Sequence, residues 1–550
     1  VAYRKVAADD LLGGVSVVNM EELMEKNYNT YSLDNMQGYV GGWNGNSLWG
    51  MDSDNAGYLV LVDGIPRDAN NVQPSEISQI TFLKGAQAVV LYGSRAAKGA
   101  IYITTKRGKV DGLQIDVRAN TGFNVAKAYP EYLGSAEYMS LYNEASVNDG
   151  KEPRYSQTDI YNHASGQNPY RFPDVNFYSS DYLRKAYNRS DITAEISGGG
   201  GRTHFYSNIG YYRSEDAFKF GEAKDNNTSR LNIRGNVDMM ISDNINAYVN
   251  ANATFYDAKS ARGDYWNMAS KFRPNRVSPL IPLDMIDPNA LSALDLVNIS
   301  SNIVDGQYFL GGTQTDPTNI FGDYYASGSS KWTSRQFQFD TGVDFDLKGV
   351  LKGLTFHAKF AVDYATSYTT SFQNTYATFQ PTWSNYGGKD VIVGLTQFNN
   401  DEKTGDQIIS GSTDRQTIAF SGYFDYKNTF NDVHNLSAML IASGYQQSVS
   451  GEYQRTNNVN MALQAGYNYS RKYYADFALA AVHSSKLAEG NRIAFSPSLT
   501  LGWRLSNEDF LSSSSVVDDM MLSASGSILN QDIDITGYYM HATSWAQDYG

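Results

Sequence analysis

The chain has 550 residues, contains no cysteine and carries a formal net charge of −14 at pH 7. Without cysteine it has neither disulfides nor thiolate chemistry. The acidic balance argues against a nucleic-acid partner, which requires a basic face. Aromatic residues make up 13% of the chain, with 41 Tyr and 48 Gly. This composition suits a large all-β protein, either a membrane barrel or a secreted β-rich protein.

The first 110 residues predict a compact mixed α/β unit. Residues 20–27 predict a short helix that Asn19 can cap. Residues 58–66 predict a buried strand that runs into an Asp63-Gly64 turn. Three further elements are expected, namely a strand at 77–83, a short helix at 86–92 and a strand at 100–105.

From about residue 113 apolar and polar residues alternate with period two. Leu113, Ile115 and Val117 alternate with Gln114, Asp116 and Arg118. The same alternation recurs in the segments 231–241, 245–255, 337–347, 354–364 and 418–426. Successive side chains of a strand point to opposite faces, so each segment has one apolar and one polar face. No stretch approaches the roughly 20 apolar residues of a spanning helix, so a membrane location would depend on these strands.

The links between these segments alternate in length. Links at 198–201, 242–244 and 348–353 are short, whereas those at 124–187, 258–331 and 367–413 are long. Transmembrane barrels have this asymmetry, with tight periplasmic turns and long extracellular loops. About thirteen strands can be counted, an odd number that cannot close a bacterial barrel. We therefore expect C-terminal strands to be missing, about nine of them in the 22-stranded class.

Two groups of motifs carry a family resemblance. Val62-Asp63-Gly64-Ile65-Pro66 and the stretch 91–101 resemble the plug of TonB-dependent receptors, and the stretch 103–108 resembles the SusC/RagA-like branch. Far downstream, four segments resemble barrel strands of that branch, namely 466–474, 495–498, 502–506 and 508–511. The stretch 38–50 lacks the family's Ile-Arg-Gly step, and 482–485 replaces its Asp-Gly-Ser-Ser segment. Both departures affect ligand geometry more than the fold.

The resemblance implies a mostly β fold: a 22-stranded antiparallel barrel in the Gram-negative outer membrane, incomplete here, with an N-terminal α/β plug in its lumen. Residues 1–110 would form the plug and residues 111–550 the first part of the barrel. The implied function is TonB-dependent import, without a cofactor. The implied partners are outer-membrane lipid, a SusD-like surface lipoprotein, and TonB through a segment upstream of Val1. The cargo would be an oligosaccharide or, as a second choice, an oligopeptide.

Two sets of residues are candidates for ligand binding. Trp43 and Trp49, with Asn44 and Asn46 nearby, could form an aromatic platform for sugars at the plug apex. Alternatively, these tryptophans pack the plug against the barrel. The second set lies in the long links and includes Tyr324, Tyr325 and Trp383. These residues could contact ligand or belong to the aromatic girdle at the membrane interface.

Basic residues of the plug are candidates for holding it in place. The resemblance implies that plug cations such as Lys84, Arg95 and Arg107 pair with inward-facing acids of the barrel. Polar and hydrated contacts reorganise more readily than a dry core, which suits a removable plug. The alternative is that these side chains are solvated at the surface.

Catalytic motifs are absent from the sequence. It contains no His-Glu-x-x-His, Gly-x-Ser-x-Gly or Walker motif, and its six histidines are scattered without the spacing of metal ligands. We expect neither an enzyme nor a metal site. Two alternatives stay open, a secreted glycan-binding adhesin and a polysaccharide-degrading enzyme that uses a pair of carboxylates.

Overall fold

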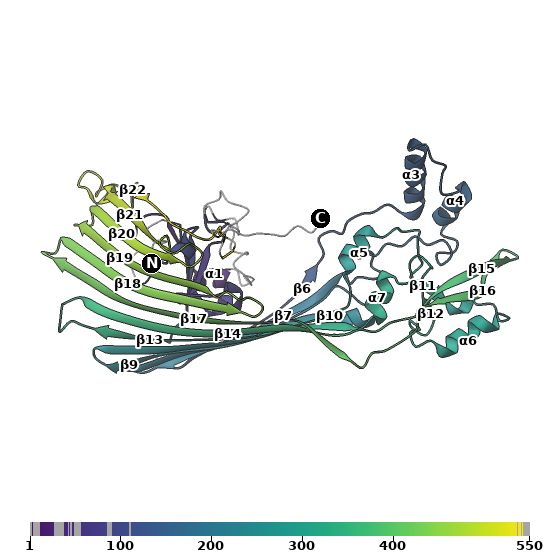
Figure 1. The fold of residues 1–550 in the computed structure, drawn as a ribbon, viewed down its shortest axis with the longest axis horizontal. Coiled ribbons are helices and arrows are strands. Elements are labelled where there is room, and N and C mark those ends of the chain that lie inside the picture. The colour runs from purple at the N-terminus through teal and green to yellow at the C-terminus, as the bar shows by residue number, and fades with distance from the viewer. Residues whose placement is uncertain are drawn as a thin grey trace.

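The computed structural model describes residues 3, 12–26, 38–41, 43, 47–48, 57–84, 91–108, 112–535, 537–538, 540 and 542. Two sheets dominate this part of the chain (Figure 1). We call the N-terminal five-stranded unit, which falls within residues 12–108, the plug. We call the thirteen-stranded sheet the wall. The wall curves around the plug (Figure 1).

The plug contains one mixed sheet with the strand order β1-β4-β5-β2-β3. Its elements are β1 (Val15–Asn19), α1 (Met20–Lys26), β2 (Leu59–Val62), β3 (Ile65–Pro66), η3 (Ala69–Asn71), η4 (Pro74–Glu76), β4 (Ile77–Leu83), η5 (Ser94–Ala96) and β5 (Ala100–Thr105). The predicted helix cap is confirmed, because the amide of Glu21 donates to Asn19 Oδ1 at 3.1 Å. Asp63 and Gly64, with φ of 50° and 86°, form the predicted turn between β2 and β3. The helix expected at 86–92 falls largely outside the described residues.

The core of the plug is apolar and closely packed. Ile80, Phe82, Ile101 and Ile103 are each 0% exposed and pack together from the central strands β4 and β5. Alternate residues of both strands therefore point into this core, as the period of a strand requires.

The wall is antiparallel throughout, and β6 and β22 are its two edges. Its strands are β6 (Gln114–Val125), β7 (Ala186–Gly199), β8 (Thr203–Glu215), β9 (Asn227–Ser242), β10 (Ile245–Ala261), β13 (Ser329–Asp346), β14 (Leu354–Phe372), β17 (Gln407–Phe430), β18 (His434–Val449), β19 (Thr456–Tyr469), β20 (Tyr473–Ser484), β21 (Ile493–Arg504) and β22 (Met521–Ser527). The division of the chain at about residue 110 and the number of missing strands stay predictions.

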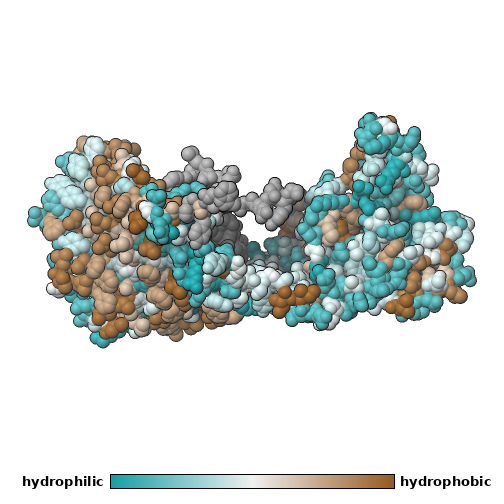
Figure 2. All heavy atoms as spheres, viewed as in Figure 1, coloured by the Kyte–Doolittle hydropathy of each residue, from teal (hydrophilic) through white to brown (hydrophobic). Residues whose placement is uncertain are grey.

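The two faces of the wall differ in polarity. On the outward face Ile233, Phe337 and Phe420 are 41%, 49% and 55% exposed. On the inward face Asn232 and Asn236 are fully buried against the plug side. Figure 2 shows hydrophobic residues gathered over the part of the wall that surrounds the plug. A soluble sheet would bury its apolar face, whereas a sheet in lipid turns that face outward.

The two rims of the wall also differ. One rim has short links at 200–202, 243–244, 347–353, 431–433 and 470–472, whereas the last link on this rim, at 505–520, is longer and contains η8 (Leu505–Asn507). On the opposite rim the links at 450–455 and 485–492 are short, whereas those between β6 and β7, β8 and β9, β10 and β13, and β14 and β17 form a lobe (Figure 1). Its elements are α3 (Ser135–Asn148), α4 (Gln157–Ser165), η6 (Gly221–Asp225), α5 (Tyr265–Lys271), β11 (Leu280–Pro282), η7 (Leu283–Met285), α6 (Leu291–Ile299), β12 (Tyr308–Leu310), α7 (Ile320–Ala326), β15 (Thr378–Tyr386) and β16 (Lys389–Phe398). Among the described residues, no helix is both long and apolar enough to cross a membrane.

Candidate functional site

Arg67 forms the most extensive ionic contact between plug and wall. It follows β3, and its Nε and Nη2 donate to the two oxygens of Asp363 at 2.8 and 2.7 Å. Its Nη1 donates to Asp340 Oδ1 at 2.6 Å, and Asn250 donates to the other oxygen of Asp340. Burial acts to lower the pKa of Arg67, but the two carboxylates outweigh burial and raise it above its ordinary value. The guanidinium is therefore a fully charged anchor.

A second polar contact surrounds the turn between β2 and β3. The carboxylate of Asp63 accepts from the backbone N and the hydroxyl of Thr105 at 3.0 and 2.7 Å. Lys359 of β14 donates to the backbone carbonyl of Asp63. Burial acts to raise the pKa of Asp63, but the charges of Arg107 and Arg234 and the bonds from Thr105 outweigh it and lower the pKa. Asp63 therefore stays ionised between the plug and the wall.

Two of the plug cations that the sequence singles out reach the wall. Arg107 donates to Asn250 Oδ1 at 2.7 Å and to Asp238 at 3.3 Å. The guanidinium of Arg95 lies 4.0 Å from the centre of the Tyr445 ring on β18, a cation–π contact rather than the expected ion pair.

Lys84 does not make the expected contact among the described residues. It donates to the carbonyl of Gly41 within the plug. Lys84 directly follows β4, and its backbone N donates to the carbonyl of Gly14, just before β1. A contact between Lys84 and the wall stays a prediction.

Sequence reasoning missed three plug residues that form ion pairs with the wall. Besides Arg67, Glu76 pairs with Arg234 at 2.8 Å with both side chains buried, and Lys106 pairs with Glu195 at 2.7 Å. Arg234 lies on the polar face of the strand predicted at 231–241. A charged residue on that inward face could have been predicted to contact the plug. The identity of its partner depends on the fold.

The opposite side of the plug makes an apolar contact. Leu91, Tyr92 and Ala96 pack against the small residues Ala478 and Ala480 of β20 and their neighbours on β18 and β19. The plug is therefore held by ions on the side of β7 to β14 and by close packing on the side of β18 to β20.

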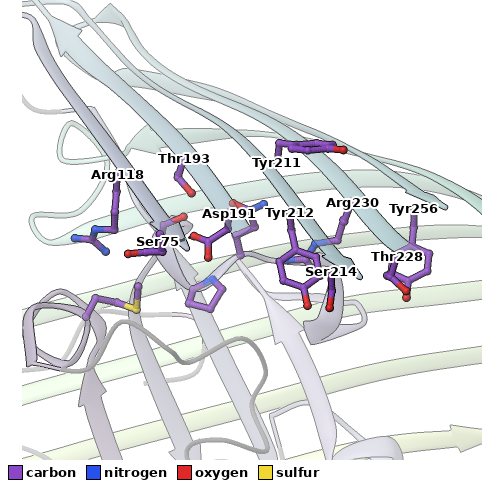
Figure 3. Close-up of a pocket in the computed structure, with 14 residues that line it drawn as sticks. Ser75, Arg118, Asp191, Thr193, Tyr211, Tyr212, Ser214, Thr228, Arg230 and Tyr256 are labelled. Carbon is purple, nitrogen blue, oxygen red and sulfur yellow. Dashed lines mark hydrogen bonds between the residues drawn. The ribbon is translucent and has the colours of Figure 1, made fainter. Parts of the chain in front are cut away.

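Two cavities between the plug and the wall are lined by described residues. The first has a volume of about 420 Å³ and is lined by Ser75 of the plug and by Arg118, Asp191, Tyr212 and Arg230 of the wall, among others. Figure 3 shows Tyr212, Arg230 and Tyr256 on one side of the strands, with Tyr211 on the other side. The second cavity, of about 280 Å³, lies among Arg67, Arg95, Arg415, Asp363 and Tyr445. Both offer hydrogen-bond donors and aromatic rings, which suits a polar ligand.

Trp43, Tyr324, Tyr325 and Trp383, the described aromatic residues proposed as ligand contacts, do not line either cavity. Trp43 is 5% exposed and packs on Phe82 inside the plug core, with the ring centres 5.0 Å apart, rather than between the plug and the wall. Asn44, Asn46 and Trp49 lie outside the described residues. Tyr324 is buried in the lobe, and burial raises its pKa.

Tyr325 and Trp383, the other two candidate ligand contacts in the lobe, are only partly buried. Tyr325 stacks on Phe321, with the ring centres 5.7 Å apart, and Trp383 packs against the apolar cluster beneath β15 and β16. Their roles in ligand binding stay predictions. In the described part of the chain, no three His, Asp or Glu side chains converge so as to hold a metal ion.

A lipid-facing antiparallel wall with a small α/β unit seated on its polar face defines a plugged outer-membrane barrel. Residues 5–100 match the family model described as the TonB-dependent receptor plug domain. The chain is 24% identical to TonB-dependent receptor SusC of Bacteroides thetaiotaomicron, over 96% of this chain and 53% of that protein. It is 22% identical to TonB-dependent receptor P26 of Formosa agariphila, over 89% of this chain and 47% of that protein. The chain spans about half the length of the curated relatives it matches.

The fold matches a solved structure of the RagAB peptide importer in its open-open state. The TM-score is 0.68 and the identity 18%, over 96% of this chain and 60% of the other. The chain is thus a SusC/RagA-like homologue of TonB-dependent receptors and an outer-membrane protein. Its relatives are receptors rather than enzymes, in agreement with the absence of catalytic motifs.

Proposed function

We propose that the protein imports a large nutrient across the outer membrane, with the plug closing the barrel until TonB displaces it. The observation that carries this proposal is the polar seating of the plug. Arg67, Glu76, Lys106 and Arg107 all pair with groups of the wall. Such contacts can be exchanged for water when the plug moves, at a lower cost than exposing a dry core.

The proposal extends to two partners and a cargo. A SusD-like surface lipoprotein would cover the lobe and enclose the cargo, and TonB would engage a segment upstream of Val1. We propose an oligosaccharide as cargo, and an oligopeptide as the alternative. The two polar cavities between the plug and the wall suit either cargo, because sugar hydroxyls and peptide amides bond to the same protein donors and acceptors.

Uptake by cells tests this function. A strain without the gene should lose growth on one glycan or peptide mixture from a panel, and the full-length gene should restore it. Restored growth should disappear when TonB is deleted or the proton-motive force is collapsed. Growth that is unchanged in the deletion strain on every source would contradict import, and growth that survives loss of TonB would contradict energy coupling.

A further inference from the structure

The second cavity differs from an ordinary gap between packed surfaces in the charges that line it. The plug contributes Arg67 and Arg95, and the wall contributes Arg415 from β17. The wall side comes from β13, β14, β17 and β18, which lie in the middle of the strand order and far from the edge strands β6 and β22. Both sides of this cavity are therefore formed by the described chain.

The three arginines do not have equal partners. Arg67 is occupied by Asp340 and by both oxygens of Asp363. Two carboxylates line the cavity, those of Asp68 and Asp363, and Asp363 is neutralised by Arg67. Asp340, Asp363 and Asp68 equal the three arginines in number, but neither Arg95 nor Arg415 pairs with a carboxylate among the described residues. An arginine without a carboxylate partner can bind an oxyanion in a cleft, since the low-dielectric walls strengthen the charge-assisted bond.

Arg95 is held in a position from which it can donate. Its guanidinium is fixed over the Tyr445 ring at 4.0 Å, a contact that uses the π face of the ring. Its Nη1 is hidden from solvent and has no acceptor among the described residues. A hidden N–H without an acceptor is unfavourable, and an oxyanion in the cavity would satisfy it with a charge-assisted bond.

Arg415 is arranged differently. It is exposed at the edge of the cavity and lies on the same face of β17 as the buried Thr417. Amide side chains complete the lining, namely Gln336, Gln338 and Gln447. One partly buried and one exposed guanidinium, surrounded by amides, can hold an oxyanion while the rest of a polar ligand extends away from the cavity.

We propose that this cavity is a subsite for a carboxylate group of the cargo, bound by Arg95 and Arg415. The inference rests on the proposed import function, because it assigns the cargo an acidic group. The shared chemistry can come from an acidic sugar or an acidic peptide, so the test uses one pair of probes for each source.

Equilibrium binding to the purified full-length protein tests the proposal. The first pair is tetragalacturonate and its carboxyl-reduced counterpart, and the second is hexaglutamate and hexaglutamine. In at least one pair the acidic probe should bind about tenfold tighter or more at low salt, the range expected of a charge-assisted bond. The preference should shrink in 0.5 M NaCl, because salt screens a partly exposed guanidinium such as Arg415.

Three variants locate the preference. Arg415→Gln should weaken binding of the acidic probe about tenfold, leave the neutral probe within twofold and leave folding unchanged, since Arg415 is exposed. Arg95→Gln should have the same effect on the probes. Arg213→Gln, which changes an exposed arginine of β8 outside both cavities, should change neither.

Two results would overturn the proposal. One is the absence of an acidic preference in both pairs, including the case in which no probe binds. The other is a preference that survives in Arg415→Gln. Neither result bears on import itself, which is judged separately by growth of the deletion strain.

Discussion

At the scale of single residues, Arg67 is the side chain on which plug seating depends most. Its two carboxylate partners, Asp340 and Asp363, are buried to 1% and 13% side-chain exposure. We expect Arg67→Ala to weaken the seating by about 3–5 kcal/mol, because it leaves two carboxylates unpaired between plug and wall. The full-length protein in a planar bilayer should then conduct ions where the wild type is closed.

Two controls separate this effect from general damage. Arg67→Lys keeps the charge but loses the two-pronged bond to Asp363, so it should conduct less than Arg67→Ala. Arg276→Ala removes a partly exposed pair with Asp316 in the lobe and should leave conductance unchanged. Conductance that is equal in all three variants would show that the seating does not depend on Arg67.

Trp43 offers a second test at this scale. Because its ring is buried against Phe82, we expect Trp43→Ala to cost about 3–5 kcal/mol of plug stability through the cavity it leaves. Hydrogen exchange at the amides of β4 and β5 should accelerate, and Trp43→Phe should accelerate it less. If exchange is unchanged while affinity for cargo falls, Trp43 binds ligand rather than packing the core.

The candidate site could be predicted only in part from single residues. Arg95 and Arg107 follow recognisable plug motifs, so their contact with the wall could be expected. Arg67 directly follows the plug motif 62–66 and was still missed, because nothing in that motif identifies its acidic partners, which lie 273 and 296 positions later in the chain. These ion pairs depend on how far β13 and β14 are shifted along their own axes relative to the plug. A period-two pattern shows which face a residue lies on, but it does not fix that shift.

At the scale of elements, Asp401 joins two parts of the lobe. One oxygen accepts from the hydroxyl of Ser300 and the amide of Ser301, and the other accepts from Asn302 and from the amide of Ala377 at 2.8 Å. Burial acts to raise the pKa of Asp401, but these four bonds lower it. The carboxylate thereby ties the segment after α6 to the start of β15.

We expect Asp401→Asn to loosen this connection. An amide has one acceptor oxygen, so it cannot accept on both sides, and a loss on the order of 1–2 kcal/mol of local opening free energy should follow. Hydrogen exchange at Ser301 and Ala377 should accelerate several-fold. Asp149→Asn, at an exposed pair with Lys151, is the control and should change nothing. Unchanged exchange in Asp401→Asn would mean that other contacts hold the two segments.

The wall strands could be predicted from sequence, whereas the lobe could not. Alternation marks a strand whose two faces meet different solvents, and each wall strand satisfies that condition. The lobe helices carry no comparable signal. For example, α5 spans only Tyr265–Lys271 and depends on aromatic packing of Tyr265 against Phe218 and Tyr324. Short helices of this kind are stabilised by tertiary contacts rather than by local propensity.

At the scale of the whole molecule, the wall and the plug meet different physical requirements. The wall must expose apolar side chains to lipid, so its polar residues are confined to the lumen. The plug must fill that lumen and yet be removable. The ionic contacts on one side can be exchanged for water when the plug moves. On the other side, displacement has to expose the buried apolar cluster that includes Leu91, Ile441 and Ala478, so this side holds the plug more firmly.

The charge of Asp63 makes the seating of the plug depend on acid. Its pKa in the seated state lies below its ordinary value of about 3.9, which a displaced and hydrated Asp63 would regain. The stabilisation is therefore fully present above about pH 4 and is lost as the pH falls through the lowered pKa.

We expect bilayer conductance of the full-length protein to stay low from pH 7 to pH 4 and to rise below that. In Asp63→Asn, which cannot titrate, conductance should be raised at pH 7 and the acid step due to Asp63 should be absent. A rise that is already complete at pH 5, or an unchanged acid step in Asp63→Asn, would place the acid-sensitive contact elsewhere.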